Sequence, residues 1–595
     1  MKNHKHQTKF KRILFCVGVG VLFTVQNVAA QYAMPSPAWA KDLIIYELNP
    51  KGFTSPQGAE TGTFNSTREK IPYLAELGIN GVWFSGHNWG DHRHFYNIWT
   101  QYATIRQDSI EPTLGSPAEF KAMIDDFHRH GIKVFLDVIT HGVISYSPLI
   151  WEHPTWFKGG SWGMTDFDWY GGHSDLDAWW VNTYTNYVTR YGVDGFRLDV
   201  DMYRPDLWNR IKENARQAGH PIVVFDEPTQ HCEGVADFYQ KMTALSVQTE
   251  GVDTNNRLID NAAAFYSNSI NTIHDFAVRE VKLTYSDDTQ VMNLPFTLVT
   301  GEPEAKIKIS RLDPAKTVKG VSVTIEGKSG VFRGEVTYSI LGTKADLSEY
   351  PLYLTGLSEI TVGFTPYLPD NYLQTIQLSC HDDGWDGFPL TGNPYVAEGS
   401  RCLFGYSCLF QPAIPIFMSG EEFDADYMPF PSHSPFLFKK ERVGQGKWLY
   451  ATMIQWEQLK QKKHADMLAD VKKMIAIRKQ ESSLLYASKN NAASNIDSLA
   501  FSCSAKVPIP YILWNDKTAL LVAGNPTDKD VKITVDIPLD KIKQGAKKII
   551  VTDLWNGGKK EITSEGLRKF TFTVKKDYTA GGGIGIFKIE SLISM

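Results

Sequence analysis

Three carboxyl side chains follow strand-like apolar runs in this sequence, and one of them has an arginine two residues before it. The run GFRLD at 195–199 puts Arg197 and Asp199 on one face of a strand and apolar side chains on the other. Glu227 follows PIVVFD, and Asp382 follows TIQLSCH. Cleavage of a glycosidic bond needs an acid for the leaving oxygen and a carboxylate for the cationic sugar carbon. These residues therefore predict glycosidic-bond chemistry, with a structural ion pair as the alternative for Arg197 and Asp199.

The surroundings of these acids suit different roles. A guanidinium beside Asp199 favours the ionised carboxylate, which suits a nucleophile. The apolar run before Glu227 predicts a dry environment, and desolvation raises the pKa of a carboxyl group, which suits a general acid. His381 supplies a hydrogen-bond donor for a sugar hydroxyl, and Asp382 supplies a second carboxylate to stabilise positive charge. We therefore predict Asp199, Glu227 and Asp382 as the catalytic residues.

The elements that must position these residues alternate between strands and helices from about residue 41 to residue 479. Apolar runs at 41–48, 79–86, 132–140, 193–201 and 221–228 read as short buried strands. Between them lie amphipathic segments, and this alternation is typical of a parallel sheet built from βαβ units. In one helical segment Ser116 and Glu119 indicate a capping box, and Gly131 indicates the end of the helix.

The spacing of the acids agrees with a (β/α)8 barrel. Asp199 and Glu227 are 28 residues apart, close to the roughly 30 residues of one strand–helix unit of such a barrel. Asp137, Asp199 and Glu227 then end different strands, and the loops at that end converge on one site. The sequence therefore predicts the α/β class, with a TIM barrel as its main domain.

Two departures from this alternation predict further domains. Between 282 and 372 the apolar pattern changes to period two, which is typical of an inserted antiparallel β module. The tail at 491–595 has the same period and reads as a C-terminal β-sandwich. The barrel would then comprise 31–281 and 373–490. The inserted module has no tryptophan, which favours a spacer or interaction surface over a carbohydrate-binding module.

A Gly- and Trp-rich segment at 142–175 reads as a short irregular loop domain of the barrel. Its tryptophans have two possible roles, either as the small apolar core of the loop or as a platform on which sugar rings stack. We expect two of them in the core and the others in a platform. The tryptophans considered are Trp151, Trp156, Trp162 and Trp169.

The first 30 residues have the order of a secretory signal peptide. Basic residues precede the apolar run ILFCVGVGVLFTV, and Val28 and Ala30 offer small residues before a cleavage point. A membrane anchor is the weaker alternative, because the run is shorter than the ~20 residues that span a bilayer. We expect an exported protein, periplasmic or extracellular, whose mature chain begins near Gln31. No cysteine follows that point directly, so the sequence does not predict a lipid anchor.

Charge and cysteine content exclude several classes of function. The formal net charge of −5 gives no electrostatic reason to expect a nucleic acid or an anionic membrane as a partner. After Cys16, which lies in the signal segment, the remaining cysteines are odd in number and scattered, which is not typical of a disulfide framework. Cys402 and Cys408 are close enough in sequence to pair. No cysteine and histidine cluster has zinc spacing.

Taken in order, these motifs resemble the α-amylase family of glycoside hydrolases, glycoside hydrolase family 13. GFRLD resembles its nucleophile strand, FDE its acid/base strand, HDD its third-carboxylate motif and VFLDVITH an early strand motif. The resemblance covers roughly 42–479 and implies a retaining mechanism on α-glucosides. It also implies that Asp199 is the nucleophile, Glu227 the general acid/base and Asp382 the transition-state stabiliser. Asp137, Arg197 and His381 would contact substrate, and Tyr96 would stack under the reacting sugar.

The sequence departs from the family pattern at several positions. The early motif usually ends in Asn and His, where this chain has His141 and Gly142, and a histidine that commonly follows the nucleophile strand is replaced by Tyr203. The loop motif Tyr-Asp is Tyr96-Asn97 here. The usual Asn is a ligand of a structural calcium ion in the family, so we assign no metal ligand and expect no certain cofactor.

The expected function is therefore an exported retaining hydrolase of starch- or maltodextrin-like α-glucans. One alternative is a transglycosylase of the same family, which uses the same three carboxylates. Another is a glycan-binding protein with impaired catalysis, which the missing histidines favour and the intact carboxylates oppose. An inverting enzyme is disfavoured, and carboxyl groups about 5–5.5 Å apart would be the mark of retention.

Overall fold

The computed structural model describes most of the chain between residues 36 and 592. The described ranges are 36–58, 61–91, 102–160, 163–200, 203–227, 237–239, 276–285, 287–292, 294–300, 305–313, 315–316, 318–327, 333–339, 359–364, 374–377, 381, 401–409, 413–425, 427–429, 452–485, 496–505, 507–508, 510–515, 518–538 and 548–592. The expected signal peptide at 1–30, Tyr96, Trp162, Cys380 and Asp382 lie outside the described residues.

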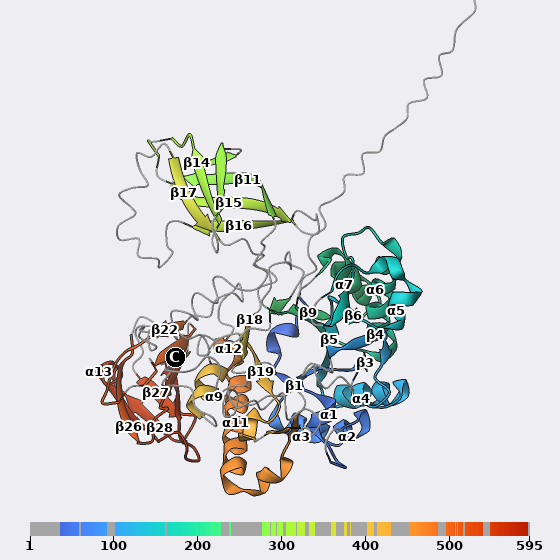
Figure 1. The fold of residues 1–595 in the computed structure, drawn as a ribbon. Coiled ribbons are helices and arrows are strands. Elements are labelled where there is room, and N and C mark those ends of the chain that lie inside the picture. Colours follow the sequence, from blue (N-terminus) through green and yellow to red (C-terminus); the bar gives the residue numbers. More distant parts are fainter. Residues whose placement is uncertain are drawn as a thin grey trace, which may run out of the picture.

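The core of the described chain is a parallel sheet of eight strands, and it confirms the predicted α/β barrel (Figure 1). The sheet order is β10-β9-β8-β5-β2-β1-β19-β18, and every pairing in it is parallel. Its two edge strands, β10 and β18, lie close together, so that the sheet curves round towards closure. The strands are β1 (Ile45–Leu48), β2 (Gly81–Phe84), β5 (Lys133–Ile139), β8 (Gly195–Asp199), β9 (Val223–Asp226), β10 (Phe238–Tyr239), β18 (Gln374–Gln377) and β19 (Ala413–Met418).

Helices separate these strands in the chain, as the alternating pattern predicts. They are α3 (Ile71–Leu77), α4 (Pro117–Arg129), α6 (Ser174–Asn186), α7 (Pro205–Gln217), α9 (Arg401–Cys408) and α11 (Lys462–Gln480). The predicted capping box of α4 is confirmed, since the Ser116 hydroxyl accepts from the Glu119 amide and the Glu119 carboxylate accepts from the Ser116 amide. Gly131 follows the helix with φ +74°, a conformation that glycine adopts without steric cost.

The side chains of β8 alternate as the sequence predicts. Arg197 and Asp199 face the barrel interior, while Phe196 and Leu198 are fully buried, and the Phe196 ring packs against Tyr184 of α6 and Trp208 of α7. Below Arg197, Gly195 leaves no room for a side chain, because a Cβ there would lie 2.0 Å from the Val223 carbonyl oxygen. The alternation therefore directs one charged pair inward and attaches the strand to the helices on its other face.

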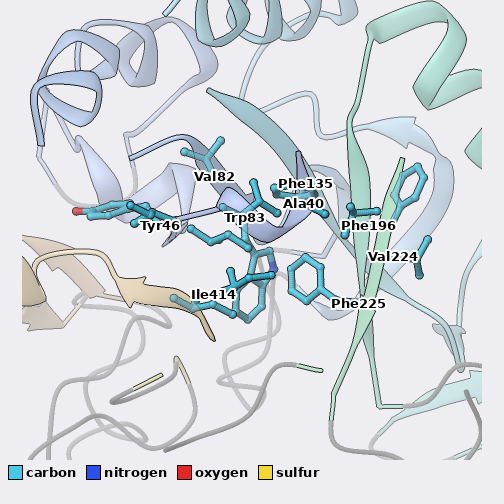
Figure 2. Packing of buried hydrophobic residues seen from close by; sticks show 14 of the residues in the cluster. Ala40, Tyr46, Val82, Trp83, Phe135, Phe196, Val224, Phe225 and Ile414 are labelled. Carbon is cyan, nitrogen blue, oxygen red and sulfur yellow. The ribbon is translucent and has the colours of Figure 1, made fainter. Parts of the chain in front are cut away.

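Large aromatic rings fill the barrel interior beneath the charged residues (Figure 2). The rings of Trp83 and Phe225 meet edge-on at 6.0 Å between centroids, and Phe225 meets Phe135 at 5.8 Å. All three side chains are fully buried. The interior is therefore packed and dry up to the level of the acids.

The segment at 142–175 contains short regular elements around an aromatic core. The strands β6 (Gly142–Ile144) and β7 (Met164–Asp166) pair antiparallel, with α5 (Pro148–Glu152) and η3 (Pro154–Trp156) between them. Trp156 and Trp169 are buried, which agrees with the expectation of two core tryptophans. Trp151 is 78% exposed and is the described candidate for a platform. A second hairpin pairs β3 (Asn88–Gly90) with β4 (Thr104–Ile110).

Antiparallel strands follow the sixth barrel strand and form the two sheets drawn apart from the barrel in Figure 1. One has the order β12-β11-β15-β16 and the other β13-β14-β17. The first strand begins at Phe276, ahead of the expected boundary at 282; the division of the chain into domains stays a prediction. The strands are β11 (Phe276–Tyr285), β12 (Gln290–Met292), β13 (Phe296–Thr300), β14 (Ala305–Ser310), β15 (Val318–Gly327), β16 (Arg333–Ser339) and β17 (Glu359–Phe364).

The C-terminal part forms two further antiparallel sheets with a common apolar core. The larger has the order β22-β24-β25-β30-β27-β28, and the smaller has the order β23-β26-β29. Polar contacts attach this part to α9 and α11, as described in the Discussion. The strands are β22 (Ile496–Ser498), β23 (Ala500–Cys503), β24 (Tyr511–Trp514), β25 (Thr518–Gly524), β26 (Val531–Asp536), β27 (Lys548–Asp553), β28 (Lys559–Ile562), β29 (Phe570–Val574) and β30 (Ile584–Leu592).

The remaining described elements are short. They are η1 (Ala40–Asp42), α1 (Pro50–Phe53), α2 (Phe64–Arg68), η4 (Tyr187–Tyr191), η6 (Glu421–Phe423), β20 (Tyr427–Pro429), β21 (Thr452–Ile454), η7 (Trp456–Lys460), α12 (Ser482–Leu485) and α13 (Ser564–Arg568). Within the described ranges no helix is long and apolar enough to cross a membrane. Cys402 and Cys408 are buried free thiols, so the pairing that their spacing allows does not form.

Candidate active site

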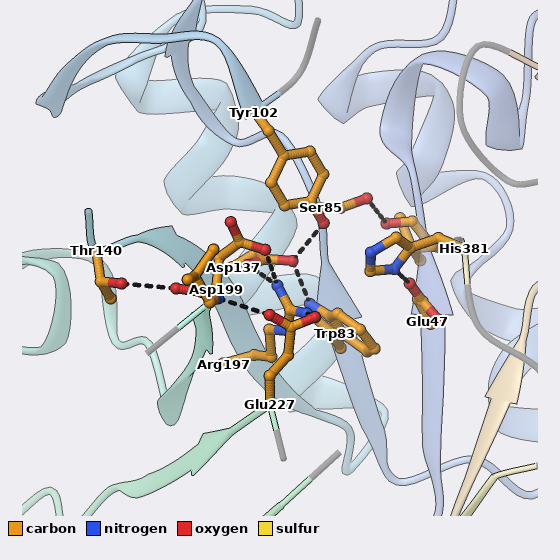
Figure 3. A network of polar contacts seen from close by, with 12 residues as sticks. Glu47, Trp83, Ser85, Tyr102, Asp137, Thr140, Arg197, Asp199, Glu227 and His381 are labelled. Carbon is orange, nitrogen blue, oxygen red and sulfur yellow. Dashed lines mark hydrogen bonds and ion pairs between the residues drawn. The ribbon is translucent and has the colours of Figure 1, made fainter. Parts of the chain in front are cut away.

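The predicted site residues that the structure describes meet at the C-terminal end of the parallel sheet (Figure 3). Asp137 lies on β5, Arg197 and Asp199 on β8, Glu227 directly after β9, and His381 shortly after β18. The register pairs Asp137 with Arg197, so their side chains rise at the same level of the barrel. Strand ends far apart in sequence thus converge, as the barrel prediction requires.

Arg197 is the centre of this group. Its guanidinium is fully buried, and its Nη1 donates to Asp137 Oδ1 at 3.0 Å and to Asp199 Oδ1 at 2.6 Å. Its Nη2 forms an ion pair with Glu227 Oε1 at 2.6 Å, and its Cζ lies 5.0 Å from the centre of the Trp83 ring. One cation therefore holds three carboxylates from three strands in a fixed arrangement. The ion pair and the active-site interpretation of Arg197 and Asp199 are thus compatible.

Asp137 lies below the two predicted catalytic acids. It is 2% exposed, and its Oδ2 accepts from Trp83 Nε1 at 3.0 Å and from the Tyr102 hydroxyl at 2.6 Å. Its Oδ1 accepts from Arg197. Both oxygens are therefore engaged with protein donors. For Asp137 the sequence leaves a substrate contact and a structural role open, and this geometry favours the structural role.

The charge balance of the group favours one bound proton. Burial, followed by the Glu227 and Asp137 carboxylates, raises the pKa of Asp199 to about 8, against the opposing effect of Arg197. The sequence predicts that Arg197 keeps Asp199 ionised; the ion pair is present, but desolvation outweighs its effect on the pKa of Asp199. Since Asp199 and Glu227 contact the same guanidinium, the titration of Asp199 depends on the charge of this neighbour.

A strained backbone position links the two predicted catalytic acids. Val200, directly after Asp199, has φ +68°, which is rare for a β-branched residue. In this conformation its amide donates to Glu227 Oε2 at 2.6 Å. The Thr140 hydroxyl donates to the Asp199 carbonyl at 2.6 Å. The end of β8 is therefore held from two sides, and strain at such a position is typical of functional sites.

His381 lies on the opposite side of the group. Its Nδ1 contacts the Glu47 carboxylate, and both side chains are almost fully buried. The Tyr102 ring stacks on the imidazole at 5.6 Å between centroids, and the Trp83 ring meets it edge-on at 5.4 Å. Sequence reasoning misses Glu47, Trp83 and Tyr102. The sequence does offer a signal for two of them, because Glu47 and Trp83 are a charged and a large residue inside the first two strand runs. In the structure these two positions are paired across the sheet.

At the position where the family has an Asn that binds calcium, this chain has His141, which contacts Asp166. His141, which stands where the family has Asn, is buried, and its Nδ1 lies 3.3 Å from Asp166 Oδ1 of β7. Calcium takes oxygen ligands, and an imidazole facing the carboxylate does not supply one. The residues at this place therefore do not fit the ion. In the described part of the chain no group of three or more His, Cys, Asp or Glu side chains has the geometry of a metal site.

Comparisons with known proteins agree with this geometry. A family model described as "Alpha amylase, catalytic domain" matches residues 47–147, which include β2, β5 and the last two residues of β1. The alpha-amylase MalA of Haloarcula japonica is 26% identical over 232 residues, which are 35% of this chain and 33% of that protein. The maltogenic alpha-amylase of Bacillus acidopullulyticus is 28% identical over 214 residues, 30% of this chain and 35% of that protein. The matched region thus spans about a third of the length of these relatives.

Solved structures extend the likeness to nearly the whole fold. The maltogenic alpha-amylase AmyB of Thermotoga neapolitana has a TM-score of 0.55 at 13% identity, with 93% of this chain and 100% of that chain covered. The alpha-amylase of Geobacillus thermoleovorans, solved with acarbose, has a TM-score of 0.52 at 12% identity, with 93% and 99% covered. At such identities the likeness concerns the fold. Together with the family match and the relatives, it shows that the chain is similar in part of its sequence, and in its fold, to α-amylases.

Proposed function

We propose that this protein hydrolyses α-glucosidic bonds in starch- or maltodextrin-like glucans with retention of configuration. The observation that carries the proposal is the contact of Arg197 with both Asp199 and Glu227 at the open end of the barrel. Retaining cleavage needs two carboxyl groups that face one bond and share one proton between them. The names of the relatives support α-glucans as the substrate class.

The first half of the proposed reaction uses the two acids in opposite protonation states. Glu227 gives its proton to the glycosidic oxygen, and the bond from that oxygen to the anomeric carbon breaks. Asp199 attacks the same carbon as a carboxylate and forms a glycosyl ester. For this step the shared proton must reside on Glu227, and Arg197 lies close enough to Asp199 to stabilise its charge. Asp382 is the proposed stabiliser of the positive charge on the sugar.

The second half returns the enzyme to its starting state. Glu227, now a carboxylate, takes a proton from water, and the water oxygen attacks the anomeric carbon and releases Asp199. The Val200 amide, which donates to Glu227 Oε2, and Arg197, which contacts Oε1, hold this carboxylate in place. Each of the two displacements inverts the configuration of the anomeric carbon, so the product keeps the configuration of the substrate.

Transglycosylation is the second candidate, because it differs only in the acceptor that attacks the ester. Product analysis separates the two. The mature protein is incubated with starch, pullulan, maltoheptaose and trehalose, beside Glu227→Gln and the matched control Glu213→Gln, a glutamate on the surface of α7 paired with Arg216. Shorter sugars from the parent and from Glu213→Gln, but not from Glu227→Gln, are the expected result.

Other outcomes of this experiment have clear meanings. Products longer than maltoheptaose would establish transfer instead of hydrolysis. No product from any of the four substrates, with maltoheptaose binding retained, would overturn the proposal in favour of a glycan-binding protein. Equal activity of Glu227→Gln and the parent would exclude Glu227 as the acid.

We further propose that the protein is exported. The support is the signal-like order of the first 30 residues, with basic residues, a short apolar run and small residues before Gln31. Mass spectrometry of the protein recovered from fractionated cells tests this. A chain that begins near Gln31 outside the cytoplasm is expected, and an intact N-terminus in the cytoplasm would contradict export.

A further inference from the structure

The proposed reaction gives no role to Glu47, a buried carboxylate of the barrel. Glu47 lies on β1, is 0% exposed, and pairs in register with Trp83 of β2 and Met418 of β19. An ionised carboxylate at the centre of a barrel is costly unless it is paired and hydrogen-bonded. A structural purpose alone is served as well by an apolar residue of similar size. The position therefore invites a functional explanation.

The partner of Glu47 is His381, which adjoins the proposed third carboxylate in sequence. The contact uses Nδ1 of the ring, and the Tyr102 and Trp83 rings enclose the imidazole on its face and its edge. The side of the ring away from Glu47 is turned toward the group around Arg197 (Figure 3). Glu47 thus contacts Nδ1, and the other ring nitrogen, Nε2, lies on the side of the ring that faces the residues around Arg197.

The protonation of the pair determines what Nε2 offers to a ligand. When the pair holds two protons, Nε2 carries a hydrogen whether Nδ1 donates to the Glu47 carboxylate or accepts from a protonated Glu47. When the pair holds one proton, Nδ1 keeps it against the carboxylate and Nε2 becomes an acceptor. Burial disfavours the second arrangement, because it leaves an uncompensated negative charge inside the barrel.

The neighbouring charges do not reverse this preference. Arg197 lowers the pKa of Glu47, whereas Asp137 and burial raise it, with burial the largest effect. The Tyr102 hydroxyl, on the face of the imidazole, is a neutral donor to Asp137, and its pKa lies well above the ordinary value because it is buried. Three carboxylates and one guanidinium leave the surroundings negative when all are ionised, which favours retention of the second proton.

We propose that Glu47 is a positioning residue that holds His381 with its Nε2–H directed at a hydroxyl of the reacting sugar. This inference rests on the proposed function, since it assigns the donor a place in glycoside cleavage. The hydrogen bond strengthens as positive charge develops on the ring of the sugar and its hydroxyls become more acidic. Glu47 acts through His381 and does not itself touch the substrate.

A double-mutant cycle tests the proposal in the full-length mature enzyme. The steady-state kinetics of the parent, Glu47→Gln, His381→Gln and the double variant are measured on maltoheptaose from pH 5 to pH 9. Loss of a charge-assisted hydrogen bond predicts that Glu47→Gln lowers kcat/KM by about tenfold or more. The part of the alkaline limb of kcat/KM that comes from loss of the pair's second proton should disappear, because the Gln amide, which can donate to Nδ1 as a protonated Glu47 does, loses no proton in this pH range. In the His381→Gln background the same change should have little further effect, since the two residues act as a unit.

A matched control separates this role from a structural one. Glu422, also buried, accepts from the hydroxyls of Tyr46 and Tyr73 and lies outside the proposed machinery. Glu422→Gln is expected to lower the thermal midpoint and to leave the shape of the pH profile unchanged. If Glu47→Gln behaved as Glu422→Gln does, or if its effect simply added to that of His381→Gln, the proposal would be overturned.

The outcomes also distinguish this proposal from the proposed function. Turnover by the parent with a Glu47→Gln profile that superimposes on it would reject the role of Glu47 and leave glycoside hydrolysis intact. Absence of turnover by a folded parent would reject the proposed function and, with it, the role of Glu47 in that reaction.

Discussion

At the scale of single residues, the main feature of the site is that its carboxylates outnumber its cation. One guanidinium, that of Arg197, contacts three carboxylates in a buried space, so that the ionised group would be net negative. The GFRLD pattern predicts the shared face of Arg197 and Asp199. It does not predict the burial and the two further acids that raise the pKa of Asp199 to about 8. Those contributions come from other strands and depend on the closed sheet.

The first prediction concerns Asp137, whose negative charge raises the pKa of Asp199. In Asp137→Asn that negative charge is gone, and the Arg197 guanidinium no longer has to neutralise Asp137 as well as Asp199. The pKa of Asp199 should therefore fall, so that the shared proton is lost at lower pH. We expect the alkaline limb of kcat/KM to move to lower pH than in the parent. An unchanged or raised limb in a folded variant would contradict this assignment of the proton.

The second prediction concerns His87, whose ring is buried between Phe120 and Tyr187. Among the described residues neither ring nitrogen has a hydrogen-bond partner, and burial lowers the pKa of the ring to about 3. Below about pH 6.5 the unfolded chain binds a proton that the folded chain does not, so stability falls as the pH falls. At 1.36 kcal/mol per pH unit, the loss is about 2 kcal/mol at pH 5.

Replacement of this ring by an apolar group should remove the acid sensitivity. In His87→Leu the free energy of unfolding should change less between pH 7.5 and pH 5 than in the parent, as measured by urea denaturation. The control is His130→Leu, which replaces the exposed histidine directly after α4 and should keep the parent's pH dependence. An equal loss in His87→Leu and the parent would show that other groups cause the acid sensitivity.

At the scale of elements, the Arg204 side chain attaches the chain that follows β8 to α6 and to the segment at 142–175. Arg204 has φ +54° and donates to both oxygens of Asp177 on α6, at 2.7 and 2.6 Å. It also donates to Asp206 and to the Trp169 carbonyl. This clamp by Arg204 therefore connects the chain that follows β8 to α6 through Asp177 and to the segment at 142–175 through the Trp169 carbonyl.

The third prediction is that Arg204→Ala destabilises the protein and loosens this junction. Loss of a partly buried bidentate contact predicts a decrease of about 1–3 kcal/mol in the free energy of unfolding. Arg216→Ala removes the exposed Arg216–Glu213 pair on α7, the helix that Arg204 precedes, and should change stability by less than about 0.5 kcal/mol. Urea denaturation of both variants makes the comparison. Equal effects would show that the clamp has no special role.

The sequence predicts elements better than it predicts contacts between them. The five strand runs, the capping box of α4 and the two core tryptophans all appear in the structure because each depends on local alternation or a local cap. Glu47 and His381 are 334 positions apart, and no local period connects them. The contact arises only when the first and seventh strands of the barrel come to lie on either side of β19.

At the scale of the whole molecule, the C-terminal sheets are attached to the barrel by polar contacts at helix surfaces. Asp470 of α11 accepts from Arg401 Nε of α9 at 2.5 Å and from the Gly581 amide at 2.9 Å. The Tyr511 hydroxyl donates to the Tyr406 carbonyl at 2.8 Å, and the Cys402 amide donates to Asp577 at 2.9 Å. The two parts therefore share buried hydrogen bonds and should unfold together.

The fourth prediction tests this coupling. Asp470→Ala leaves the buried Arg401 without a main partner, which predicts a loss of about 3–5 kcal/mol. Calorimetry should show one transition in the parent and a lower, divided transition in Asp470→Ala. Asp466→Ala, which removes an exposed pair with Lys462 on the same helix, should resemble the parent. A single transition at the parent's temperature in Asp470→Ala would contradict the coupling of the two parts.

The central claim is that Asp199 forms a bond to the sugar, and one measurement tests it most directly. The parent enzyme is incubated with a fluorinated α-glucosyl fluoride that forms the ester faster than water removes it, and its peptides are analysed by mass spectrometry. The account predicts one added glycosyl group, on Asp199 in the peptide that contains GFRLD. An adduct on another residue, or turnover without an adduct and with products of inverted configuration, would contradict it.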